Sequence, residues 1–76
     1  MKNFDIESIE LSMNQLKEIG AEVRRELEKK QAYYAKLCGI DRQMINAVVK
    51  GRSNFKNETL INVYKAIRKD LQQQQN

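Results

Sequence analysis

The segment 13–30 carries apolar residues at helical spacing. They recur at steps of three or four residues, which places them on one helical face: Leu16, Ile19, Val23 and Leu27. Ser12 and Gln15 match the S-x-x-Q form of a capping box, so we expect this helix to begin near residue 13. Gly20 lies inside it at a cost of about 1 kcal/mol relative to Ala, and this cost suggests that another element approaches closely there.

A second, shorter helix is predicted around Tyr34, Ala35 and Cys38, whose spacing suits about two helical turns. Gly39 is expected to end it, because glycine readily adopts the left-handed conformation at a helix C-terminus. Tyr33 and Tyr34 are adjacent and cannot both face inward, so we expect Tyr34 in the core and Tyr33 at the surface. We expect Cys38 to be a small core residue rather than a reactive thiol.

A third helix is predicted over residues 42–50, with Asp41 as its N-cap and Gly51 at its end. The polar loop 51–56 contains one aromatic residue, Phe55, which we expect to pin the loop to the core. The apolar side of the helix consists of Met44, Ile45, Val48 and Val49.

The last predicted helix follows Asn57, which we expect to cap it, with Glu58 favourable to its dipole. Its apolar face consists of Leu60, Ile61, Val63, Tyr64, Ile67 and Leu71. Residues 72–76 are four glutamines and an asparagine, a composition typical of a disordered tail. The pattern therefore predicts a compact all-α domain of four helices, possibly five, over residues 14–71.

Residues 1–13 form an arm whose structure the pattern leaves open. Ile9, Leu11 and Met13 alternate as in a strand, and so do Phe4 and Ile6. A helix fits almost as well. A single strand has no partner elsewhere in a helical chain, so a strand here would pair with its copy in a second chain.

The net charge of +4 hides an uneven distribution. Residues 29–56 hold seven Lys or Arg and one Asp, a net charge of +6, whereas residues 1–28 carry −3. A basic segment of this kind attracts a polyanion such as nucleic acid or an anionic membrane surface. The alternative is an ordinary solvated face.

The composition excludes several kinds of chemistry. The 76 residues include one Cys and no His, which rules out a Cys/His zinc site, a Ser-His or Cys-His nucleophile pair and an internal disulfide. We therefore expect no enzymatic activity, no metal and no cofactor. No apolar run is long enough to span a membrane, and the N-terminus lacks the pattern of a signal peptide, so we expect a cytoplasmic protein.

The two short helices and their turn carry the most informative pattern. Counted from Gln31, the small Ala35 is fifth and Gly39 is ninth. A small residue lets two helices cross closely, and glycine accepts the positive φ of the turn. Five apolar, core-facing residues complete the pattern: Tyr34, Cys38, Ile40, Ile45 and Val48.

This window, QAYYAKLCGIDRQMINAVVKG, resembles the helix-turn-helix of the lambda-repressor/Cro-like (XRE) family. The resemblance covers roughly residues 16–67 and includes a last helix similar to the fourth helix of the family. It implies a lambda-repressor-like DNA-binding domain, with the helix-turn-helix at the second and third helices.

The resemblance also implies roles for individual residues. Gln31 occupies the start of the second helix, where the family often has a Gln near a DNA phosphate. The positions where family members touch base edges hold Arg42, Gln43, Met44 and Asn46. Arg suits guanine, Gln and Asn suit adenine, and Met suits a thymine methyl. The positions where family members hold the phosphate backbone contain Lys50, Arg52, Asn54 and Lys56.

Three features depart from the family's pattern. Many members pair an Arg of the first helix with a Glu near the end of the third, but Val49 stands at the Glu position here. Arg24 would then pair elsewhere, for instance with Glu28, or stay partly exposed. Lys30 replaces the usual Thr or Ser at the N-cap of the second helix. A Gln tail follows where many members have a dimer-forming fifth helix, so residues 1–13 are a candidate substitute for that dimer contact.

The function implied by the resemblance is that of a transcriptional regulator, most simply a repressor, of bacterial or phage type. It would bind double-stranded DNA as a dimer on a pseudo-palindromic site, with half-sites about 34 Å apart. A protein-interaction role on the same fold, as an antitoxin or antirepressor, is the alternative, because a fold does not fix a function.

Overall fold

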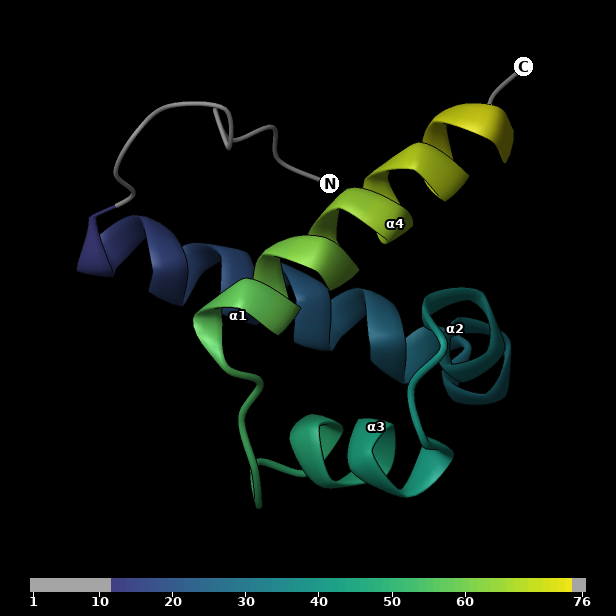
Figure 1. Cartoon of the computed structure of the whole chain (residues 1–76), viewed down its shortest axis with the longest axis horizontal. Coiled ribbons are helices and arrows are strands. Elements are labelled where there is room, and N and C mark those ends of the chain that lie inside the picture. The colour runs from purple at the N-terminus through teal and green to yellow at the C-terminus, as the bar shows by residue number, and fades with distance from the viewer. Residues whose placement is uncertain (1–11, 75–76) are drawn as a thin grey trace.

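The computed structural model describes residues 12–74, and within that range the chain forms four helices and no strand. The helices are α1 (Met13–Lys29), α2 (Gln31–Cys38), α3 (Arg42–Val49) and α4 (Asn57–Gln74). α1 runs through the middle of the molecule and contacts each of the other three, while α4 crosses it and α3 lies at the edge (Figure 1). The predicted all-α architecture is confirmed.

The core lies where α1, α3 and α4 meet. Its fully buried side chains all occupy predicted apolar positions: Ile19, Val23, Leu27, Ile45, Tyr64 and Ile67. α2 adds Tyr34 and Ala35, which are buried as predicted. Cys38 is half-buried against the core. Phe55 of the loop also packs against the core, as expected.

Local capping explains where the helices begin and end. The backbone N–H of Ser12 donates to Gln15 Oε1 at 2.8 Å, and the Gln15 N–H donates to Ser12 Oγ at 3.1 Å, so the predicted capping box is confirmed. Asp41 caps α3 by accepting from the Gln43 N–H at 2.9 Å. Gly39 ends α2 with a φ of 66°.

Four expectations from the sequence differ from the structure: three concern where helices begin or end, and one concerns packing at Gly20. Asn57 is the first residue of α4 rather than its cap, because the Leu60 N–H donates to the Lys56 carbonyl. Residues 72–74 are helical, so the predicted disordered tail is wrong for that part. Met13 belongs to α1 and not to the arm. No described element approaches Gly20: a Cβ there would meet nothing within 4 Å.

The predicted strand or helix in the N-terminal arm falls mostly on residues 1–11, which lie outside the described residues.

Replacing Gly39 by Ala should lower the free energy of unfolding by about 1–2 kcal/mol, because an L side chain is strained at positive φ. The native φ of 66° permits no relief without moving the turn. Urea unfolding followed by far-UV circular dichroism measures the loss. Gly39→Asn is the matched control, since Asn tolerates the left-handed region better, and its loss should be smaller. Equal losses would show that the cost does not come from the backbone conformation.

Candidate nucleic-acid interface

α2, a three-residue turn and α3 form one unit that presents the outer side of α3. Tyr34 and Ile45 face inward and are buried, which fixes both short helices to the core. Arg42 and Gln43 are exposed at the start of α3, and Asn46 is half-buried one turn later. Residues spaced by three or four share one helical face, so these three side chains form a common outer surface.

A hydrogen bond joins the start of α2 to the middle of α3. Asn46 Nδ2 donates to Gln31 Oε1 at 3.3 Å, which connects the first residue of α2 to the middle of α3. The family resemblance places both residues at the DNA, and no local pattern in the sequence indicates that they contact each other. The bond fixes the orientation of both amide groups and leaves the remaining polar atoms of each side chain for other partners.

Met44 has a different environment from its neighbours on α3. It is half-buried, and its sulfur accepts a weak hydrogen bond from Ser53 Oγ at 3.8 Å. The contact fastens the loop 51–56 to α3. The predicted contact of Met44 with a thymine methyl stays a prediction.

The end of α3 and the following loop carry cations without neutralising partners. Lys50, Arg52 and Lys56 are exposed, as is Asn54, and none of the three cations forms an ion pair within residues 12–74. The backbone holds the loop: the Arg52 N–H donates to the Ala47 carbonyl at 2.8 Å. A compact positive edge therefore continues the exposed face of α3.

A family model described as helix-turn-helix, of the lambda-repressor-like (XRE) type, matches residues 21–74 and so spans most of the chain. The chain belongs to this family. Comparisons with curated proteins and with solved structures found no match. Membership of this helix-turn-helix family implies DNA binding, and the family is typically non-enzymatic.

Two further features of the described residues bear on other functions. No helix of this XRE-family domain within residues 12–74 is long and apolar enough to cross a membrane. No group of three or more His, Cys, Asp or Glu side chains in the same range is placed to hold a metal ion.

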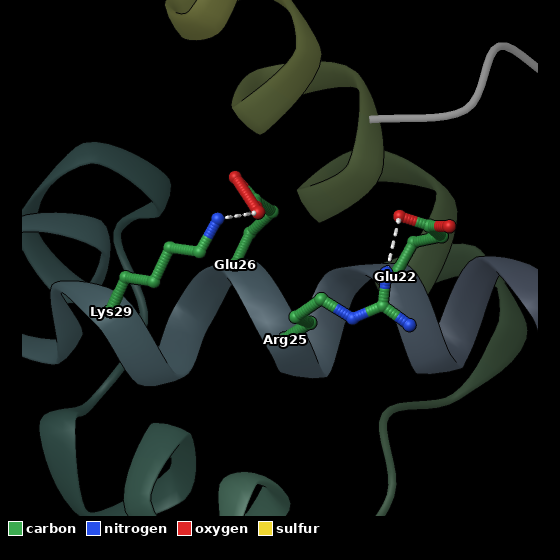
Figure 2. Close-up of polar contacts among 4 residues, drawn as sticks. All are labelled: Glu22, Arg25, Glu26 and Lys29. Atoms are coloured by element: carbon green, nitrogen blue, oxygen red, sulfur yellow. Dashed lines mark hydrogen bonds and ion pairs between the residues drawn. The ribbon is translucent and has the colours of Figure 1, made fainter.

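The acidic side chains of α1 in this XRE-family domain are partly neutralised within the helix. Glu26 is 7% exposed and accepts from Lys29 Nζ at 2.7 Å, and Glu22 pairs with Arg25 at 3.7 Å (Figure 2). Arg24 is exposed and has no ion pair within residues 12–74. Its predicted pairing with Glu28 is therefore absent, and the other expectation for Arg24, partial exposure, is the one that the structure shows.

A buried carboxylate that the sequence analysis missed ties α2 to α4. Asp70 is 8% exposed; Tyr33 Oη donates to its Oδ1 at 2.5 Å and Gln74 Nε2 to its Oδ2 at 2.8 Å. Tyr33 lies at the surface as predicted, yet it holds the outer side of α2 in place. The available signal was an acidic residue three positions after Ile67 on the apolar face of α4.

The hydrogen bond to Asp70 raises the pKa of Tyr33 above its ordinary value, and partial desolvation adds to the shift. Because the folded-state pKa is raised, this interaction stabilises the domain below the ordinary tyrosine pKa and is lost as the pH rises through the folded-state value. We expect the melting temperature of Tyr33→Phe to lie below that of the parent at pH 7, with the gap narrowing only as the pH rises above the ordinary tyrosine pKa of about 10. Thermal unfolding at a series of pH values tests this, and a gap that widens with pH would contradict it.

Proposed function

We propose that the chain is a sequence-specific regulator of transcription that places α3 in the major groove of double-stranded DNA. The observation that carries this proposal is the exposed start of α3, with Arg42 and Gln43 free to reach outward, beside the unpaired cations of residues 50–56. The major groove admits an α-helix and presents a distinct donor and acceptor pattern for each base pair.

Base recognition rests on the outer face of α3. The guanidinium of Arg42 donates to guanine O6 and N7, while the amides of Gln43 and Asn46 pair with adenine N6 and N7. Gln31 reaches a phosphate with its amide nitrogen while its oxygen holds Asn46. Met44 supplies an apolar contact with a thymine methyl from its exposed part.

Backbone contacts rest on the end of α3 and the loop after it. The residues in these roles are Lys50, Arg52, Asn54 and Lys56. Phosphate contacts fix the register of a protein on the duplex without reading its sequence. They also make the affinity depend steeply on salt.

The regulator binds as a homodimer to a pseudo-palindromic site, with one α3 in each of two major grooves about 34 Å apart. Repression then follows from occupying the promoter.

Selection of bound sites from a random DNA pool at near-physiological salt tests the proposal. We expect a two-fold symmetric motif whose half-sites are separated by one helical turn. Enrichment of a single half-site would contradict the dimer. Binding that depends on salt alone, with no enriched motif, would contradict sequence-specific recognition.

Replacing Lys56 by Ala should weaken binding to selected and unrelated DNA alike, and should reduce the slope of log K against log salt by about one. The reason is that one phosphate contact fewer releases about one counterion fewer. Titrations at four salt concentrations measure the slope. The matched control is Lys69→Ala, which removes an exposed cation from the C-terminal half of α4. Its slope should equal that of the parent.

A further inference from the structure

A groove of about 380 Å³ lies on the side of α1 near its start. It is bounded by α1, the end of α3, the loop before α4 and the first turn of α4. Its apolar lining comes from Met13, Leu16, Val23, Val48, Phe55 and Leu60. Met13 is 71% exposed, so the apolar surface continues onto the lip of the groove at the first residue of α1.

Two cations of α1, Lys17 and Arg24, also line this groove. Both are exposed, and neither has an ion pair within residues 12–74. The apolar lining and the two unpaired cations together favour an occupant that has both apolar and acidic side chains.

Gly20 lies between the two cations on α1 and lines the same groove. A helix-interior glycine costs about 1 kcal/mol relative to alanine, yet no described element comes near it, since a Cβ there would meet nothing within 4 Å. The open space above Gly20 leaves room for a further stretch of chain to pack on the helix.

Residues 1–11 have the composition that this groove requires. They contain Asp5, Glu7 and Glu10 against one Lys, a net charge of −2. Large apolar residues stand beside these acids in the sequence: Phe4, Ile6, Ile9 and Leu11. Charge and apolarity are therefore complementary to those of the groove.

The segment also has the length and the attachment point that docking in the same chain needs. It ends at Leu11, two residues before Met13 on the lip of the groove. From Met13 to Arg24 along α1 is about 16 Å at 1.5 Å per residue, and eight extended residues cover about 26 Å. The covalent link also gives such a segment an effective concentration in the millimolar range.

We propose that residues 1–11 dock in this groove of their own chain. Their acidic side chains neutralise Lys17 and Arg24, and their apolar side chains cover Leu16, Phe55 and the open face of Gly20. The domain thereby acquires a second layer over α1.

Amide hydrogen exchange of residues 4–10, followed by NMR in the full-length chain, tests this proposal. The blocking variant is Gly20→Leu, which places a bulky side chain on the groove side of α1 at a position where a Cβ meets nothing within 4 Å. We expect exchange of residues 4–10 to be several-fold slower in the parent than in this variant. The matched control is Ala32→Leu, an exposed α2 position outside the groove, which should keep the slow exchange.

Two further measurements, at different protein concentrations and with the groove cations replaced, distinguish docking within one chain from docking of a second copy. Slow exchange should be the same over a fifty-fold dilution, and it should disappear in Lys17→Glu/Arg24→Glu. Slow exchange that grows with protein concentration would show a second copy in the groove and overturn the proposal. Equal exchange rates in the parent and in Gly20→Leu, with the helical circular dichroism of both intact, would overturn it as well.

Discussion

Alanine in place of Arg42 should weaken binding to the selected DNA site by about 1–3 kcal/mol, a loss of roughly 5- to 150-fold in affinity. Arg42 is exposed in the first turn of α3, so its removal deletes two donors to a guanine without disturbing the core. The loss should be largest on the selected site and small on the same site with that guanine replaced. Fluorescence anisotropy titrations on both duplexes measure the difference.

Arg25→Ala is the control for charge. Arg25 is exposed and pairs only loosely with Glu22, on the α1 face (Figure 2), so this variant loses the same charge away from α3. We expect its affinity to stay close to that of the parent. Gln43→Ala should relax specificity at a neighbouring base pair by a similar amount. An Arg25→Ala loss as large as that of Arg42→Ala would mean that α3 is not the reading element.

Replacing Ile45 by Ala should lower the free energy of unfolding by about 2–5 kcal/mol. Ile45 is fully buried where α3 packs on the core, so the change removes apolar contacts and leaves a cavity. Small domains have total stabilities of about 5–15 kcal/mol, and this single change therefore removes a large share. Chemical unfolding followed by circular dichroism measures it, and added DNA site should recover part of the lost stability.

The comparison for Ile45 is Val49, which is only partly buried on the same helix. Val49→Ala should cost clearly less, because fewer contacts are lost and the site is open to solvent. If both variants lost the same stability, the packing of α3 would not depend on its buried face.

Most of the fold could be predicted because its determinants are local. The spacing of Ile19, Val23 and Leu27 predicts the buried face of α1, and the capping box at Ser12 predicts its start. The end of α2 follows from the φ that Gly39 accepts. Each of these signals depends on neighbours within a few residues, and the three-dimensional structure does not override them.

The differences between expectation and structure have separate physical causes. Residues 72–74 looked disordered by composition, yet glutamine is a good helix former, and Gln74 gains a partner in the buried Asp70. Gly20 indicated close packing, but no periodicity within the chain identifies what packs on it. Asn57 lies one residue inside α4, a shift too small for composition to resolve.

In the candidate site, the exposure of α3 could be predicted from the sequence, whereas its hydrogen bonds could not. The window beginning at Gln31 predicts an exposed α3, and the structure exposes Arg42 and Gln43 there. The two hydrogen bonds that hold the site, from Asn46 to Gln31 and from Tyr33 to Asp70, join residues 15 and 37 positions apart. A single sequence contains no local signal for contacts of that separation.

The short length of α2 and α3 has a consequence for how quickly the protein is degraded. α2 and α3 have eight residues each, fewer than the roughly 12–15 at which an isolated helix becomes marginally stable in water. The exposed face of α3 therefore exists only while the whole domain is folded, and bound DNA stabilises the folded form. At a free site concentration of 100 Kd, binding adds about 2.7 kcal/mol against unfolding. Under the proposed function, a copy bound to DNA is protected from proteases that attack unfolded chains, and unbound copies are degraded first. Turnover by that route would match the number of surviving molecules to the number of sites they occupy.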